Sequence, residues 1–172
     1  MKWPHLGLLA GFFFSSFVFA VNNQVIKPNL FLNQMKVLKE GEWFGDNLYF
    51  DISILRVNQP TQYIRIPEFP LSWPSSRLNT IKSTMLWSDS LKNGQKVILI
   101  VSLMDQDSKP LNPDDVIGLV RVELKNEKGD LHALWSMPNQ KSAPVIGAIR
   151  AVEKFELSNV HGHYEVYLSL DK

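Results

Sequence analysis

Apolar and polar side chains alternate with a period of two along much of the chain after residue 30. The alternation is clearest in residues 47–57, where Leu48, Phe50, Ile52 and Ile54 fall on one face. A period of two is typical of a β-strand with one buried face. The other segments that we expect to form strands are residues 30–38, 63–66, 80–87, 97–104, 116–125, 131–135 and 164–170.

Two of these segments carry further information. Residues 97–104 are uncharged and rich in β-branched side chains, which favours a central strand buried on both faces. Residues 116–125 change phase near Gly118, which indicates a β-bulge at that glycine. Lys128-Gly129-Asp130 predicts a hairpin turn into the next strand.

Helical patterns are scarce in the chain. Three prolines in residues 67–76 make a helix there implausible. Residues 142–157 fit either a strand or a short helix. Seven or eight short strands separated by turns predict an all-β fold, an antiparallel β-sandwich.

The first twenty residues form a separate unit. Lys2 precedes an apolar run over residues 6–20, and Val18 and Ala20 suit the −3 and −1 positions of a signal-peptidase site. We expect cleavage after Ala20, hence a secreted or periplasmic protein, with a lead-in over residues 21–29 and one domain over 30–172. The alternative is an uncleaved anchor, although a spanning helix needs about 20 apolar residues and this run is shorter.

Composition excludes several classes of function. The 172 residues include 18 basic and 17 acidic ones, a net charge of +1, which gives no case for nucleic-acid binding. The chain has no cysteine, so disulfides and thiol chemistry are excluded. We recognise no phosphate loop, nucleophile elbow or small-molecule site, and expect no enzyme. His161 and His163 could bind a transition metal, or could simply belong to a polar connection.

An acidic loop follows the central strand. Asp105 and Asp107 are separated by one residue, and Asp114 and Asp115 return at the far end of the loop. Calcium prefers several oxygen ligands, and two such aspartates can point at one ion while a third closes the cage. A solvated acidic loop is the alternative.

Residues 97–124 resemble the C2 domain family in the order of their parts. An apolar strand is followed by Asp-x-Asp, a loop, an aspartate, two apolar residues, a glycine and another strand. Asp46-Asn-Leu-Tyr-Phe is similar to the family's Asp-Pro-Tyr segment, with Glu40 six residues earlier, and residues 87–91 are similar to its tryptophan-containing approach to the central strand. The resemblance covers about residues 30–125.

The resemblance implies an eight-stranded antiparallel sandwich with ion-binding loops at one end. Such domains bind phospholipid surfaces, often through calcium. The residues that it implicates as metal ligands are Glu40 and Asp46 in the first loop, Asp105 and Asp107 as the Asp-x-Asp pair, and Asp115 as the closing ligand, with Asp114 as its competitor.

Trp43 and Phe44 lie in the first loop between Gly41 and Gly45. Glycines on both sides suit a tight tip. Exposed aromatics there would enter a membrane interface or a partner's pocket, whereas aromatics that fold back would cap the core.

Two functions therefore remain open. The first is an exported C2-like binding module with calcium-dependent attachment to a membrane or other surface. The alternative is a metal-free interaction subunit of a bacterial envelope or secretion assembly, in which the partner is an envelope protein.

Overall fold

The structure is a computed structural model of the chain, and it describes residues 24–41, 43, 45–107, 113–138, 145–147 and 149–172. The predicted signal peptide of residues 1–20 lies outside these residues, as do residues 21–23 of the predicted lead-in. Within the described part, no helix is both long and apolar enough to cross a bilayer.

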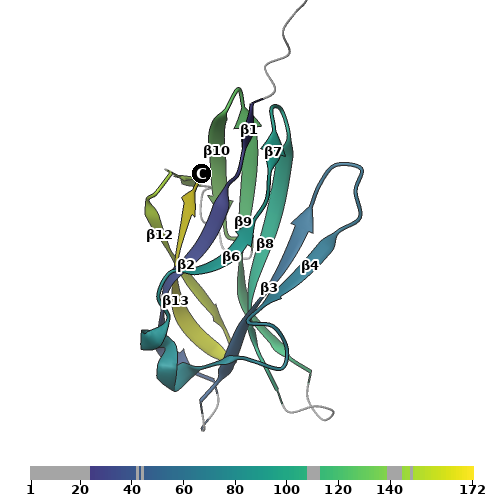
Figure 1. Cartoon of the computed structure of the whole chain (residues 1–172). Coiled ribbons are helices and arrows are strands. Elements are labelled where there is room, and N and C mark those ends of the chain that lie inside the picture. The colour runs from purple at the N-terminus through teal and green to yellow at the C-terminus, as the bar shows by residue number, and fades with distance from the viewer. Residues whose placement is uncertain (1–23, 42, 44, 108–112, 139–144, 148) are drawn as a thin grey trace, which may run out of the picture.

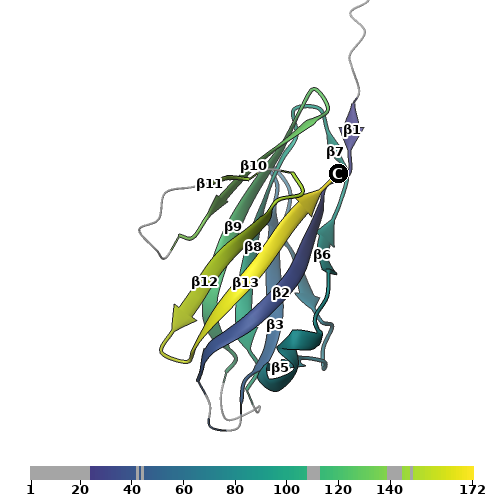
Figure 2. The ribbon, with the colours of Figure 1, turned by 90° about the vertical axis from the view of Figure 1, so that its left-hand side faces the viewer.

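Two antiparallel sheets form the body of the protein (Figures 1 and 2). The larger sheet contains, in spatial order, β11 (Val145–Gly147), β10 (Asp130–Ser136), β9 (Asp115–Glu127), β8 (Lys96–Asp105), β3 (Asn47–Leu55) and β4 (Gln62–Ile66), with β5 (Trp73–Pro74) also paired to β3. The smaller sheet contains β12 (Val152–Asn159), β13 (Gly162–Asp171), β2 (Asn29–Glu40) and β6 (Thr84–Ser88). The all-β sandwich predicted from the alternation is therefore confirmed.

A short pair of strands lies outside the two sheets. β1 (Val25–Ile26), within the predicted lead-in, pairs with β7 (Leu91–Lys92). Residues 24–29 are therefore part of the folded body.

The core lies between the two sheets and is built from alternate residues of the long strands. The alternation predicted for β3 is confirmed, because Leu48, Phe50 and Ile52 are fully buried and Ile54 almost so. The residues that meet these from the other strands include Leu30, Leu32, Leu99, Val101, Leu103, Val120, Val122, Tyr164, Val166 and Leu168.

β8 is central, but it is buried on one face and not on both as predicted. Leu99 and Val101 are fully buried, whereas Ile98 and Ile100 are only half-buried on the opposite face. The reason is that the larger sheet is an outer layer, and the described chain places no second layer over its outward face. Apolar residues therefore reach the surface there.

The bulge predicted near Gly118 is confirmed. Leu103 pairs with Gly118 and Met104 with Val116, so Ile117 is the extra residue in β9. A Cβ on Gly118 would lie 3.0 Å from Cβ of Leu157 in the opposite sheet. The predicted hairpin turn between β9 and β10 is also confirmed, with φ of 55° at Lys128 and 92° at Gly129.

Two segments need correction or completion. The strand predicted over residues 80–87 is shorter, because a 3₁₀ helix, η1 (Ser75–Thr80), comes before β6. Pro74 precedes this helix, a position where its missing N–H costs nothing. In residues 142–157, the described residues form β11, a turn at residues 149–150 and the start of β12, with no helix among them.

The sandwich has two distinct ends. We call one the loop end: it carries the β2–β3, β8–β9 and β12–β13 connections, with η1 beside them (Figures 1 and 2). The first described residue and the last residue lie at the other end, near the β9–β10 turn. There Asn126 donates a hydrogen bond to the Gln24 carbonyl at 2.9 Å, and Lys172 donates one to the Gly129 carbonyl at 2.9 Å.

Candidate functional site

The loop end gathers the six carboxylates predicted as metal ligands. Strand register brings several of them together, since Asp105 pairs with Leu48 on one side and with Asp115 on the other. Glu40 ends β2, and Asp46 lies directly before β3. The question is then which groups these carboxylates contact.

Asp46 is buried and held by three elements. Its side chain accepts a hydrogen bond from the Gly41 backbone N–H at 3.1 Å and another from the hydroxyl of Tyr164 on β13. Its backbone N–H donates to Oγ of Ser75 at 3.2 Å, and its carbonyl accepts from the Ser75 N–H at 2.8 Å. Asp46 therefore ties β2, η1 and β13 together.

Glu40 belongs to the same network. The Ser75 hydroxyl, which accepts from Asp46, donates to Oε1 of Glu40 at 2.6 Å. Ser75 is itself buried at the start of η1. The chain thus supplies hydrogen-bond donors to Glu40 and Asp46, the two first-loop residues predicted as metal ligands.

Tyr164 lies among the predicted ligands. Burial, and then the hydrogen bond to Asp46, raise the pKa of Tyr164 well above its ordinary value, and the negative charges of Asp46, Asp105 and Glu40 act in the same direction. The hydroxyl consequently stays protonated and acts as a donor toward this group of carboxylates.

The Asp-x-Asp pair divides between two roles. Asp105 is buried, and its Oδ1 accepts a hydrogen bond from the Asn47 backbone N–H at 2.8 Å, which fixes the start of β3. Asp107 donates its backbone N–H to Oδ1 of Asp114 at 3.3 Å. Oδ2 of Asp107 is buried with no hydrogen-bond partner among the described residues.

Asp114 and Asp115 contact different residues. Asp114 accepts a hydrogen bond from the Tyr49 hydroxyl at 2.8 Å and lies 3.9 Å from Nη1 of Arg65. Burial, followed by this bond to Asp114, raises the pKa of Tyr49 far above its ordinary value. Asp115 instead contacts His161, with Oδ2 of Asp115 3.1 Å from Nδ1 of His161.

Arg65 and its aromatic neighbours form one wall of the loop end. The guanidinium of Arg65 lies 3.5 Å from the centroid of the Tyr49 ring and 5.5 Å from that of Phe69. The same side chain donates hydrogen bonds to the Leu71 carbonyl at 3.2 Å and to Gln106. The positive charge of Arg65 therefore lies beside Asp114, and the side chain links β4 to the β8–β9 loop.

This arrangement does not fit the predicted calcium cage. Five of the six carboxylates accept a hydrogen bond or an ion pair from donors of the chain itself. Among the described residues, no group of three or more His, Asp and Glu side chains is placed to hold a metal ion. The two histidines considered for a transition metal also separate, because His161 contacts Asp115 whereas His163 lies 3.8 Å from Glu156.

The first loop presents an exposed aromatic side chain. Trp43 is 96% exposed, so it does not cap the core; Phe44 lies outside the described residues. Val160, in the β12–β13 turn, is 85% exposed. The two turns touch, since a Cβ on Gly41 would lie 1.6 Å from the His161 carbonyl oxygen. Two apolar side chains therefore project from adjoining turns.

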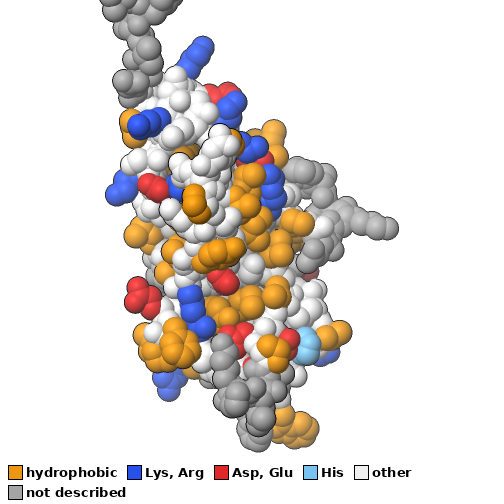
Figure 3. Space-filling model, turned by 90° about the vertical axis from the view of Figure 1, so that its right-hand side faces the viewer, with side chains coloured by type: hydrophobic (Ala, Val, Ile, Leu, Met, Phe, Trp, Pro, Cys, Tyr) orange, Lys and Arg blue, Asp and Glu red, His pale blue; other side chains and the backbone are white. Residues whose placement is uncertain are grey.

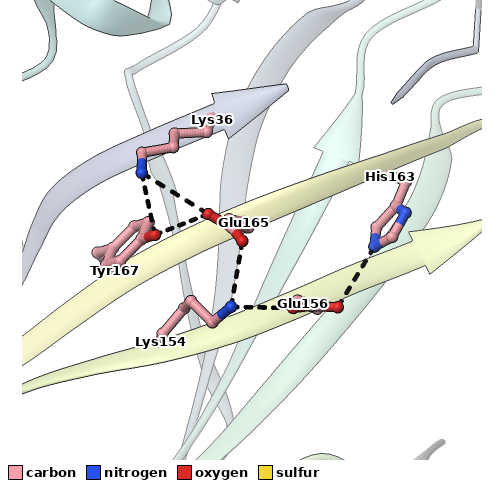
Figure 4. A network of polar contacts seen from close by, with 6 residues as sticks. All are labelled: Lys36, Lys154, Glu156, His163, Glu165 and Tyr167. Carbon is pink, nitrogen blue, oxygen red and sulfur yellow. Dashed lines mark hydrogen bonds and ion pairs between the residues drawn. The ribbon is translucent and has the colours of Figure 1, made fainter. Parts of the chain in front are cut away.

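A second polar cluster covers the outward face of the smaller sheet (Figure 4). Lys154 contacts Glu156 at 3.0 Å and Glu165 at 3.1 Å, and these hydrogen bonds raise the pKa of Lys154 to about 12. Tyr167 donates to Glu165 at 2.6 Å, and Lys36 donates to Tyr167 at 3.2 Å. Opposite charges alternate across β2, β13 and β12, which is typical of a solvated sheet face.

Comparison with known proteins gives little at the level of sequence. No family model matches the chain, and no curated protein does. Among solved structures, the chain is similar to a C2 domain of plant extended synaptotagmin 1, at 12% identity and a TM-score of 0.38, over 84% of this chain and 93% of that one. It is also similar to human GIVD cytosolic phospholipase A2 in complex with methyl gamma-linolenyl fluorophosphonate, at 8% identity and a TM-score of 0.37, over 87% of this chain and 17% of that one.

The first of these structures is a C2 domain, the family that the sequence resembles. The fold class follows from the strand order and register described above.

Proposed function

We propose that the protein is an exported, non-catalytic binding module that attaches to a lipid surface through its loop end, without requiring calcium. The observation that carries this proposal is the 96% exposure of Trp43, beside Val160 at 85%. Tryptophan favours the membrane–water interface, where its ring is partly removed from water and its N–H remains hydrated.

The charge of the loop end determines which lipid headgroups we expect it to bind. Among the described residues, the six carboxylates at the loop end outnumber the neighbouring cations Lys39, Arg65 and Arg77. A negative end is repelled by anionic headgroups unless a cation bridges them. We therefore expect zwitterionic phosphatidylcholine to bind at least as well as phosphatidylserine.

Vesicle flotation tests the proposal. Phosphatidylcholine vesicles, with and without added phosphatidylserine, are mixed with the protein in chelator and in millimolar calcium. Trp43→Ala should lower the affinity by about tenfold or more, because an indole that becomes buried at the membrane interface contributes about 1.5–3 kcal/mol. Tyr63→Ala is the matched control, since Tyr63 is a 69% exposed aromatic on β4, away from the loop end.

The other outcomes have definite meanings. Equal binding of Trp43→Ala and the parent protein would show that Trp43 is not part of the contact with the lipid surface. Binding only to phosphatidylserine, and only with calcium, would replace this proposal with the calcium-bridged one. Absence of binding to every vesicle would favour a protein partner in an envelope or secretion assembly.

Export is tested separately by mass spectrometry of the secreted protein. Cleavage after Ala20 gives a chain that begins at Val21. A product that keeps residues 1–20 and stays in the membrane fraction would contradict cleavage and favour an anchor.

A further inference from the structure

The two sheets present unlike faces to solvent. The outward face of the smaller sheet carries the alternating charges of Figure 4. The outward face of the larger sheet instead shows apolar side chains gathered over its middle (Figure 3). Apolar residues on that face include Leu55, Ile98, Ile100, Met104, Leu119, Leu134 and Ile146.

Strand register aligns part of this apolar surface. Leu55 pairs with Ile98, Ile98 with Glu123, Glu123 with Leu134, and Leu134 with Ile146. These five residues, which we call the transverse row, cross β3, β8, β9, β10 and β11. Ile146 is 83% exposed, and a depression of about 380 Å³ lies beside it and Leu134. Four strand spacings of about 4.8 Å give the row a length of about 19 Å.

The row is bordered by an excess of positive charge. Glu123 is the one carboxylate in the row, and two cations share it, Lys96 at 2.5 Å and Arg121 at 2.7 Å. Lys96 pairs across strands with Lys125, which contacts Glu127. Lys96, Arg121 and Lys125 therefore face two carboxylates, Glu123 within the row and Glu127 beside it.

We propose that the outward face of the larger sheet docks an amphipathic helix of a partner protein, with the apolar stripe of the helix on the transverse row and carboxylates along its flanks. A helix rises about 1.5 Å per residue, so about 13 residues cover the row. Apolar anchors spaced along one helix face are a common mode of recognition, and the carboxylates complement Lys96, Arg121 and Lys125. The loop end takes no part, so this inference is independent of lipid attachment.

Synthetic peptides provide the probe. One peptide of about 14 residues carries leucines at i, i+3, i+4, i+7 and i+11 flanked by glutamates, and the second has lysines in place of the glutamates. NMR titration of the full chain should show the acidic peptide shifting amide signals around Ile98, Leu134 and Ile146. It should bind about tenfold more tightly than the basic peptide.

Two variants locate the contact. Ile146→Glu should weaken the acidic peptide about tenfold, because it removes an apolar contact and adds a repelling charge. Val152→Glu is the control, on an exposed residue of β12 in the other sheet. Both positions are exposed, so the melting midpoints should stay at the parental value.

Several results would overturn the proposal. Equal affinity for the two peptides would show that the cations beside the row do not contribute to binding. Shifts confined to the loop end or to the smaller sheet would place binding elsewhere, and no shift at about 1 mM peptide would exclude this mode of docking. A doubled mass without peptide, abolished by Ile146→Glu, would show that a second copy of the chain covers the face.

Discussion

The Tyr164 hydroxyl donates a hydrogen bond to Oδ2 of Asp46, although the two residues are 118 positions apart in the chain. Both side chains are buried, and Ser75 joins them to Glu40. A donor from the last strand thus lies where the C2 resemblance implies a cation. The loop end is held together by the chain's own groups.

Tyr164→Phe should therefore destabilise the protein. The variant removes the donor and leaves the buried Asp46 carboxylate less well satisfied, which costs about 1–3 kcal/mol. Denaturant unfolding measures the change. Tyr167→Phe is the control, since it deletes a similar hydroxyl on the solvated sheet face and should cost under about 1 kcal/mol. Equal effects of the two variants would contradict a special role for Tyr164.

Calcium should leave the melting midpoint unchanged. Asp105 already accepts a hydrogen bond from the Asn47 N–H, so Asp105→Asn should lower stability by about 0.5–1.5 kcal/mol with or without the ion. Melting curves of both proteins in chelator and in millimolar calcium test this. A midpoint that rises with calcium in the parent, and not in the variant, would support the calcium site predicted from the sequence.

Neighbouring residues of β8 should respond differently to truncation. Leu99 is fully buried, so Leu99→Ala should cost about 2–5 kcal/mol. Ile100 is half-buried on the outward face, and Ile100→Ala should cost about 1 kcal/mol. Comparable losses at both positions in denaturant unfolding would mean that something covers the outward face in solution.

Glu123 should make stability depend on pH in acid. The hydrogen bond from Lys96, followed by that from Arg121, holds the pKa of Glu123 below its ordinary value of 4.5, against the effect of burial. A lowered folded-state pKa stabilises the fold above pH 4.5, and that contribution is lost as pH falls through the folded-state pKa.

Glu123→Gln should accordingly cost about 0.5–1 kcal/mol at neutral pH. The difference between the two proteins should shrink in acid. Unfolding series at several pH values measure it, and a difference that grows toward low pH would contradict the assignment.

The strands were predictable wherever one face is apolar and the other polar. In β3 the alternation of Leu48, Phe50 and Ile52 identifies the buried face directly. In β8 both faces are apolar in sequence, so the pattern could not reveal that Ile98 and Ile100 lie outward. The 3₁₀ helix was missed because its six residues are too few to show a period.

The candidate site was predictable only where its members are close in sequence. Spacing identified the aspartates of the β8–β9 loop, and the resemblance to the C2 family implied that Glu40 and Asp46 lie at the same end of the sandwich. Ser75 and Tyr164 carry no local signal, because they lie 29 and 118 positions from Asp46 and meet it only through the fold. Hydrogen bonds from such distant donors decide whether a carboxylate is available to an ion.

Gln24, the first described residue, and Lys172 lie at the end of the sandwich opposite the loop end, so the sandwich separates them from the loop end by a fixed length. β2 alone has twelve residues, which at about 3.3 Å per residue extend about 40 Å. A fluorophore on Lys172 would therefore stand about one strand length above any surface that Trp43 touches. Energy transfer from that fluorophore to a labelled bilayer would measure the distance of Lys172 from the membrane surface. That distance reports whether the long axis of the sandwich is perpendicular to the membrane or tilted.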